Sequence, residues 1–301
     1  MSESSPTLEA RAEIRVDAVT RSATALPPSF DEASLARPAA AEASGLVITA
    51  PDGTELVHGV SVSVRPGEAL GIVGESGSGK TLTCRALLGI LPEGLAVTAG
   101  SVQVGGVDLT HADEREWRRV RGTHIAAVFQ DPASYLNPAI PVGAQLEETL
   151  RVTAGLPRRQ AKERARELLD DLGIRRVDLV LRQRVAHLSG GMLQRVLIAM
   201  ALAADPAVLI ADEATTALDV TVQAELLDLL RRLRKERDLA LVLVSHDLAV
   251  VAQVCERVQV FRDGVVVEAG ATTRVLRAPG HSYTRELLSA HNAYGLERFL
   301  A

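Results

Sequence analysis

A chain of 301 residues with 47% hydrophobic and 24% charged residues has the size and composition of a soluble globular protein, with either one large α/β domain or two smaller ones. Its net charge of −5 gives no reason to expect a nucleic-acid partner, because proteins that bind nucleic acids usually carry a basic patch. The two cysteines, Cys84 and Cys255, lie far apart in apolar helical patterns. They suggest neither a disulfide framework nor a metal cluster, and they fit a reducing cytoplasm.

The sequence contains no segment that we expect to cross a membrane. The longest apolar run, residues 196–204, stops at Asp205 and Pro206 and is far shorter than the ~20 residues that a bilayer requires. The start of the chain carries several charges and no apolar core, so we do not expect a secretory signal there. Any action at a membrane is therefore expected to pass through a partner.

The first part of the chain, residues 1–44, is rich in Ala, Ser, Pro and Glu and is predicted to be mostly disordered. Within it, residues 14–19 alternate like a strand and could pair with a sheet. Order is expected to resume at residues 46–49, which are followed by the turn residues 51–53 and a second alternating run at 60–64. This turn chemistry predicts a β-hairpin.

A glycine-rich segment follows the apolar strand pattern of residues 69–73 and leads into a helical pattern at 81–88. In this context glycines let backbone N–H groups turn inward around phosphate oxygens, and the helix N-terminus adds its positive end. We expect Lys80 to reach the β- and γ-phosphates of a nucleotide and the Thr81 hydroxyl to hold Mg²⁺. The alternative, a Gly/Ser-rich turn that fits by chance, is disfavoured by the strand before it and the helix after it. The predicted phosphate-binding loop (P-loop) consists of Gly74, Glu75, Ser76, Gly77, Ser78, Gly79, Lys80 and Thr81.

Strand and helix patterns alternate along the rest of the chain, which implies a mostly parallel sheet covered on both faces. A helical stretch between Gln130 and Ser189 interrupts the alternation and is expected to be an insertion. The predicted strands are 101–104, 125–129, 208–211, 241–244, 258–261 and 265–267, and the predicted helices are 113–121, several within 142–188, 220–236, 248–255 and a C-terminal helical tail.

Two carboxylates end the apolar strand pattern that begins at residue 208. Asp212 at the strand end is suited to contact Mg²⁺, directly or through water, because this ion prefers hard oxygen ligands. Glu213 comes next and could polarise a water molecule for attack on the γ-phosphate. A solvated pair that caps the next helix is an equally good interpretation of these residues alone, but with the P-loop upstream the catalytic interpretation is favoured.

The segment Ser189, Gly190 and Gly191 is placed to open a helix, where hydroxyl and backbone N–H groups would form an anion site. On its own it would more simply be a helix N-cap. However, residues 188–195 resemble the signature of the ABC-transporter ATPase family, and residues 46–290 as a whole are similar to that family. In the family this segment grips the γ-phosphate of ATP held by the other subunit of a dimer.

Three further positions match the family in the expected order. Gln130, at a strand end before Asp131, resembles the glutamine loop that senses Mg²⁺ and water and relays motion to the membrane partner. His246 resembles the switch histidine that contacts the γ-phosphate, although a lone histidine at a strand end is more often structural. Asp219 resembles the loop that crosses the dimer interface.

The resemblance implies an α/β fold with a P-loop (RecA-like), mostly parallel sheet core, an antiparallel β subdomain and an inserted helical subdomain. It places the ATPase domain at residues 45–290, the helical insertion at 131–197 and a short tail at 291–301. It also implies ATP and Mg²⁺ as ligands, a second ATPase subunit, transmembrane permease subunits and an extracytoplasmic solute-binding protein. The protein is then expected at the cytoplasmic face of the cell membrane.

Finer features resemble the importers of dipeptides, oligopeptides or nickel. These features are residues 129–132 and 136–138, and a tail at 281–288 in which Ser282 replaces the usual proline. The alternatives are the ATPase of an exporter and a soluble ABC ATPase that acts on ribosomes or DNA. The second of these usually has two cassettes, zinc modules or long coiled-coil insertions, none of which the sequence shows.

Two positions depart from the family pattern. Ala50 occupies the place where our alignment expects an aromatic residue that stacks on adenine, and Ala214 stands where a proline usually follows the catalytic carboxylate. The second change adds a backbone N–H and removes a rigid φ angle, so Glu213 is expected to be less firmly aimed and hydrolysis to be slower.

Overall fold

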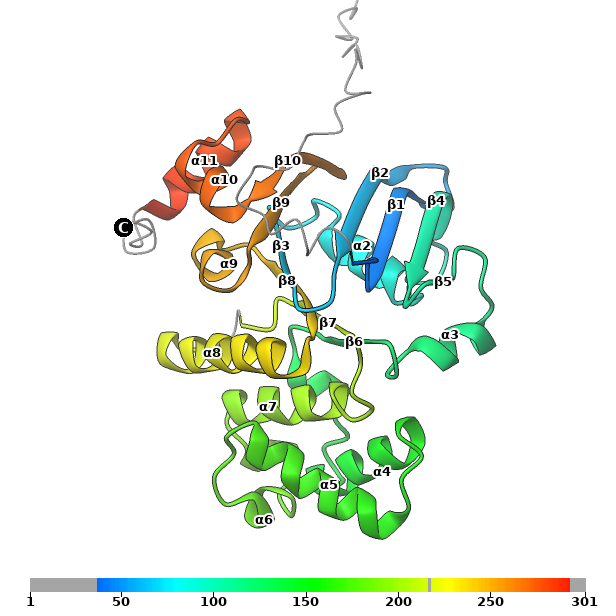
Figure 1. The fold of residues 1–301 in the computed structure, drawn as a ribbon, viewed down its shortest axis with the longest axis vertical. Coiled ribbons are helices and arrows are strands. Elements are labelled where there is room, and N and C mark those ends of the chain that lie inside the picture. The colour runs from blue at the N-terminus through cyan, green and yellow to red at the C-terminus, as the bar shows by residue number, and fades with distance from the viewer. Residues whose placement is uncertain (1–36, 216–217, 293–301) are drawn as a thin grey trace, which may run out of the picture.

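The computed structural model describes residues 37–215 and 218–292, and within them the strands form two separate sheets (Figure 1). The larger sheet has the strand order β10-β9-β3-β8-β7-β6, in which only β10 runs antiparallel to its neighbour. This confirms the predicted α/β fold with a mostly parallel core. Its strands are β3 (Ala69–Val73), β6 (Ile125–Val128), β7 (Val208–Asp212), β8 (Ala240–Ser245), β9 (Arg257–Arg262) and β10 (Val265–Ala271).

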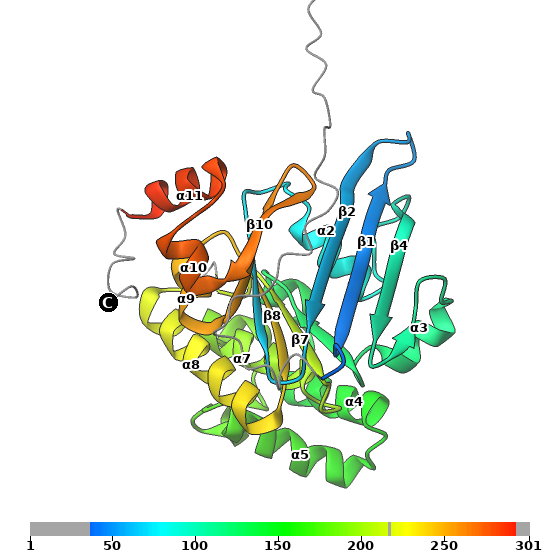
Figure 2. The ribbon, with the colours of Figure 1, turned by 45° about the horizontal axis from the view of Figure 1, so that its top comes forward.

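The central strands are continuous apolar runs because both of their faces are buried. In β3, for example, Leu70 and Ile72 face the core on the side of the smaller sheet, whereas Ala69 and Val73 face the helices on the other side. Figure 2 shows this arrangement, with α8 (Val220–Arg237) and α9 (Leu248–Val254) on one side of the sheet and α2 (Lys80–Leu87) on the other.

The smaller sheet is antiparallel, with the strand order β2-β1-β4-β5, and it confirms the predicted hairpin. Its first strand starts at Ala41, just inside the region 1–44 that the sequence predicts to be mostly disordered. Residues 14–19, the other possible strand, lie outside the described residues. The strands are β1 (Ala41–Thr49), β2 (Glu55–Val64), β4 (Ala96–Val104) and β5 (Val107–Asp108), and α3 (Glu114–Val120) follows them.

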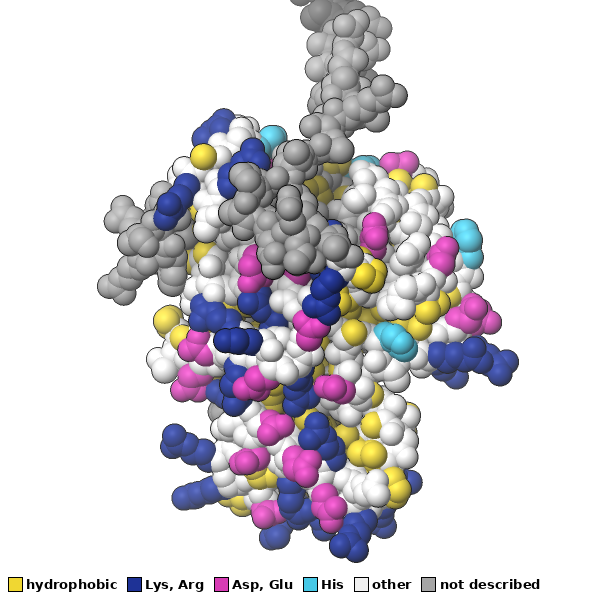
Figure 3. Space-filling model, in the orientation of Figure 1, with side chains coloured by type: hydrophobic (Ala, Val, Ile, Leu, Met, Phe, Trp, Pro, Cys, Tyr) yellow, Lys and Arg dark blue, Asp and Glu magenta, His cyan; other side chains and the backbone are white. Residues whose placement is uncertain are grey.

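A helical subdomain projects below the larger sheet in Figure 1. The long helix α5 is stabilised on its surface by ion pairs between residues three or four apart, such as Arg159 with Glu163. Figure 3 shows the resulting mixture of positive and negative side chains over this part of the molecule. The segments of the subdomain are η1 (Pro132–Tyr135), α4 (Val142–Thr153), α5 (Arg158–Asp171), α6 (Val177–Val180), η2 (Val185–His187) and α7 (Gly190–Ala201).

Two predicted domain boundaries fall inside helices of the structure. The predicted end of the insertion, residue 197, lies within α7, which continues to Ala201 and contacts α4 and α5 as well as β6. Likewise the ATPase domain was expected to end at residue 290, whereas α11 (Ser282–Asn292) runs past it and follows α10 (Thr272–Arg277). Among the described residues, none of the helices combines the length and the apolar character needed to cross a bilayer.

Candidate active site

The polar residues singled out in the sequence come together because of the strand order. The neighbouring strands β3, β8, β7 and β6 are parallel, so their carboxyl ends lie at one edge of the sheet. The P-loop follows β3, His246 follows β8, Asp212 ends β7, and Gln130 comes shortly after β6. Ligands bind at this edge in open α/β sheets.

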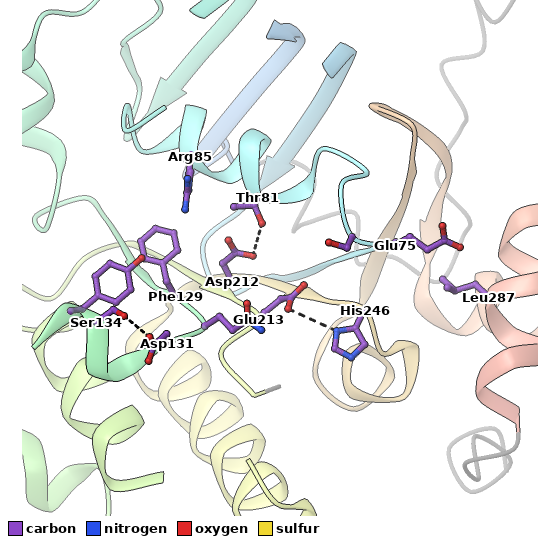
Figure 4. Close-up of a pocket in the computed structure, with 14 residues that line it drawn as sticks. Glu75, Thr81, Arg85, Phe129, Asp131, Ser134, Asp212, Glu213, His246 and Leu287 are labelled. Carbon is purple, nitrogen blue, oxygen red and sulfur yellow. Dashed lines mark hydrogen bonds and ion pairs between the residues drawn. The ribbon is translucent and has the colours of Figure 1, made fainter. Parts of the chain in front are cut away.

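A pocket of about 690 Å³ opens at this edge, within the range usual for small-molecule sites. Figure 4 shows that its walls come from the P-loop, α2, the segment after β6, the ends of β7 and β8, and α11. It is lined by Gly74, Glu75, Ser76, Thr81, Arg85, Phe129, Gln130, Asp131, Ser134, Tyr135, Asp212, Glu213, His246 and Leu287.

The P-loop adopts a backbone that its glycines make possible. Gly77 and Gly79 have φ angles of 82° and 97°, in the left-handed region that favours glycine. A Cβ atom on Gly74 would lie only 2.2 Å from the carbonyl oxygen of Phe261. The loop therefore curves tightly into the first turn of α2, as a cradle for phosphate groups requires.

Lys80 lies beneath the loop and is only 4% exposed. Its Nζ donates hydrogen bonds to the carbonyl oxygens of Gly74, at 2.8 Å, and Glu75, at 2.6 Å. Burial lowers the pKa of Lys80, and the negative charges of Glu213 and Asp212 oppose this shift. A partly desolvated ammonium close to the loop interacts more strongly with an anion than an exposed one does.

Two hard oxygen donors meet on one side of the pocket. The hydroxyl of Thr81 donates to Asp212 at 3.3 Å (Figure 4). Burial raises the pKa of Asp212, although the hydrogen bond from Thr81 works against this effect. Mg²⁺ in nucleotide sites usually takes one or two protein ligands together with substrate phosphates, so this pair fits the ion.

Glu213 stands immediately after β7 in an unusual backbone conformation. Its φ angle is 51°, which is rare outside glycine, and its N–H donates to the carbonyl oxygen of Val244 at 3.0 Å. Strained backbone of this kind often occurs at functional sites. The mostly buried carboxylate lies 4.0 Å from Nδ1 of His246, whose own side chain is half exposed at the pocket. Gln130 is exposed at the same pocket.

The segment from Ser189 to Gly191 and the residue Asp219 lie elsewhere. They do not line the pocket; instead Ser189 and Asp219 are exposed N-caps, whose side chains accept from N–H groups of α7 and α8 respectively. The N-terminus of α7 is thus open to solvent, where a second molecule can reach it.

Comparisons with known proteins agree with this geometry. Residues 57–216, more than half of the chain, match the ABC transporter family. The chain belongs to this family. It is an ATPase cassette, and its fold is that of the family's solved cassettes.

Individual relatives extend the match over most of the chain. A Brucella melitensis protein named "putative peptide import ATP-binding protein" is 46% identical over 238 residues, which cover 77% of this chain and 70% of that protein. The structure of the ATP-binding cassette MJ0796 in a dimeric post-hydrolysis state, bound to ADP and Pi, is 26% identical with a TM-score of 0.69 and covers 77% of this chain and 98% of that one. The cbiO1 protein of Clostridium perfringens, part of the ABC transporter complex cbiONQ, is 25% identical with a TM-score of 0.70, covering 87% and 97%.

The close packing between α7 and α8 requires a glycine at position 191, and this requirement can be tested. A Cβ atom on Gly191 would lie 2.5 Å from Cγ1 of Val222, a stiff β-branched side chain. We expect Gly191→Ala to lower the free energy of unfolding by about 1–3 kcal/mol, measured by chemical denaturation. Gly190→Ala is the matched control because its Cβ would meet only Leu218 at an ordinary 3.7 Å. A Val222→Ala change that restores no stability to the Gly191→Ala variant would contradict this account.

Several pocket residues lie outside the motifs recognised in the sequence. The guanidinium of Arg85 lies 5.9 Å from the centre of the Phe129 ring, and Tyr135 stacks on that ring at 5.4 Å. Arg85 could have been found, because it follows Thr81 by four residues on α2 and so shares its face of the helix. No comparable spacing points to Tyr135.

Of the two departures from the family pattern, Ala50 lies away from the pocket. It forms the turn between β1 and β2, where its N–H donates to Thr54 and its carbonyl accepts from Gly53. Ala214 is buried next to Glu213, and its predicted effect on the rate of hydrolysis remains a prediction.

Proposed function

We propose that this ATPase powers the import of peptides through separate membrane subunits. The observation that carries the proposal is that the P-loop, Asp212, Glu213, Gln130 and His246 converge on one pocket at the carboxyl edge of the sheet. Its relatives named as peptide import ATP-binding proteins favour peptides over nickel as the cargo.

The P-loop would bind the phosphates of ATP. Its backbone N–H groups surround the phosphate oxygens, and Lys80 leaves its two carbonyl partners to reach the β- and γ-phosphates. Thr81 and Asp212 would hold Mg²⁺, and Gln130, which lines the same pocket, would also contact it. The ion neutralises charge on the phosphates when it is bound.

Glu213 would act as the general base for hydrolysis. Its carboxylate accepts a proton from the water molecule that attacks the γ-phosphate in line. His246, whose Nδ1 lies 4.0 Å from that carboxylate, would contact the γ-phosphate, and Gln130 would help to orient the water. Positioning and charge neutralisation then supply most of the rate acceleration.

A second ATPase subunit would complete the site. The exposed helix end at Ser189, Gly190 and Gly191 can offer N–H groups and the helix dipole to the γ-phosphate held by a partner's P-loop. Leu218, next to Asp219 in the chain, packs near Gly190 at this helix end, so Asp219 would line the same interface. The partner is either a second copy or a related subunit.

An ATPase that powers import also requires partners in and outside the membrane. Permease subunits in the membrane would receive the motion of the helical subdomain through Gln130, and an extracytoplasmic binding protein would deliver the solute. The cassette then acts at the cytoplasmic face of the cell membrane.

Uptake by cells in which the gene has been deleted tests the proposal. We expect the deletion to abolish uptake of a radiolabelled tripeptide, and the wild-type gene and a Glu163→Gln control variant to restore it. Glu163 is a suitable control because it is an exposed carboxylate on α5, far from the pocket. A Glu213→Gln gene should not restore uptake.

Each other outcome identifies a different function. Loss of nickel uptake with normal peptide uptake would indicate a nickel importer, and accumulation of a solute inside the cells would indicate an exporter. Normal transport of all these solutes, with the protein absent from membranes, would point to a soluble ABC ATPase.

A further inference from the structure

The last described helix reaches back to the P-loop. The N–H of Glu75 donates a hydrogen bond to the hydroxyl oxygen of Tyr283, at 3.0 Å, although the two residues are 208 positions apart in the chain. Tyr283 is only 3% exposed. It stands in the first turn of α11, which lies beside the pocket in Figure 4 and contributes Leu287 to its lining.

The tyrosine ring is held firmly on several sides. It belongs to the hydrophobic core together with Leu288, and the guanidinium of Arg262 lies 4.8 Å from the ring centre. Burial raises the pKa of Tyr283, so its hydroxyl stays neutral near pH 7. A buried ring of this kind has little freedom to move its hydroxyl away from the loop.

The start of α11 is fixed by a carboxylate from β10. Glu268 accepts the N–H groups of Gly280, at 2.7 Å, and His281, at 3.0 Å. Burial alone would raise the pKa of Glu268, but the hydrogen bonds that it accepts outweigh burial and lower it. The carboxylate is therefore charged near neutral pH and anchors the turn that precedes Tyr283.

A second hydrogen bond contacts the P-loop at Ser78. The N–H of Gly264, in the turn between β9 and β10, donates to the carbonyl oxygen of Ser78 at 3.2 Å. The segment from β9 to α11 thus holds the loop at both Glu75 and Ser78.

One peptide unit joins Tyr283 to the P-loop lysine. The Gly74–Glu75 peptide donates its N–H to Tyr283 and accepts Lys80 Nζ on its carbonyl oxygen, at 2.8 Å. Hydrogen bonds on the two ends of one peptide polarise each other, so each favours the other. If the hydroxyl is removed, this N–H loses its partner, and the orientation of the peptide that Lys80 contacts becomes less restricted.

We propose that Tyr283 is a positioning residue for ATP binding, through which α11 sets the orientation of the Gly74–Glu75 peptide and of Lys80. The inference rests on the proposed binding of ATP phosphates by the P-loop. A displacement of α11 would therefore weaken nucleotide binding, although α11 supplies no phosphate ligand itself.

The substitution Tyr283→Phe in the full chain tests this role, because it removes the hydroxyl and keeps the ring. We expect the Kd for a fluorescent ATP analogue and the KM for ATP to rise about three- to tenfold, the range of one net hydrogen bond, with kcat changed less than twofold. Hydrogen exchange at the Glu75 amide should become faster. Ser289→Ala is the matched control, since Ser289 is an exposed hydroxyl on the same helix and, among the residues that the structure describes, donates to the backbone of its own helix.

The possible outcomes separate this inference from the function on which it rests. A wild-type protein that fails to bind the ATP analogue would refute the binding function itself. A wild-type protein that binds it, with Tyr283→Phe binding equally well, would overturn the inference alone. A lower melting temperature for Tyr283→Phe with unchanged Kd and unchanged exchange at Glu75 would show that the tyrosine only stabilises the fold, and this too would overturn it.

Discussion

Replacing Glu213 with glutamine is expected to slow ATP hydrolysis by at least about a hundredfold, the contribution typical of a general base. Glutamine has nearly the same shape but cannot accept the proton of the attacking water. Binding of ATP should stay within about twofold of the wild type, because in the proposed mechanism the P-loop and Lys80 would hold the phosphates and this side chain would not. The Glu213→Gln variant is therefore expected to bind ATP without hydrolysing it.

Phosphate release and equilibrium binding, measured on the same preparations, check this expectation. The backbone at Glu213 has a φ angle of 51°, and glutamine tolerates this conformation about as well as glutamate does, so the fold should survive. Glu163→Gln serves as the control, with unchanged hydrolysis. Turnover by the Glu213→Gln protein at the wild-type rate would assign the base to another group, for which His246 is the nearest candidate.

The second large effect is expected at Lys80. Its substitution by alanine removes a buried ammonium that would form charge-assisted hydrogen bonds with the phosphates, each worth about 1.5–3 kcal/mol. The Kd for ATP should therefore rise by roughly ten- to a hundredfold. The change also leaves the carbonyl oxygens of Gly74 and Glu75 without this donor, so some loss of stability accompanies it.

Titration calorimetry with ATP, together with a melting curve to show that the variant is folded, measures this effect. Lys162→Ala on the exposed face of α5 is the control, because it removes the same charge far from the pocket. If folded Lys80→Ala protein binds ATP as tightly as the wild type, the phosphates are not bound at this loop.

Local sequence patterns were sufficient to predict the main elements of the fold. The strands β3, β7 and β8 could be recognised because burial on both faces requires an almost continuous apolar run. The P-loop could be recognised because its backbone angles favour glycine. Domain boundaries have no such local pattern, since α7 runs without a break across one of the predicted boundaries and contacts β6 as well as α4 and α5.

The candidate site residues could likewise be predicted from short stretches of sequence. Asp212 was recognised because it ends an apolar strand pattern, and Lys80 because it follows a glycine-rich segment and begins a helix. The sequence by itself therefore determined which residue types could bind phosphate, hold Mg²⁺ and activate water. Arg85 was within reach of the same reasoning, since helical spacing places it on the face of Thr81.

Only the tertiary structure decided which of these residues act together. The strand order brings four strand ends to one pocket, whereas the Ser189–Gly191 segment lies on an exposed helix end outside it. The contact between Tyr283 and Glu75 has no local signal at all, because it joins residues 208 positions apart. Such contacts depend on how the whole chain packs, and packing is a property of the complete fold that no short stretch of sequence contains.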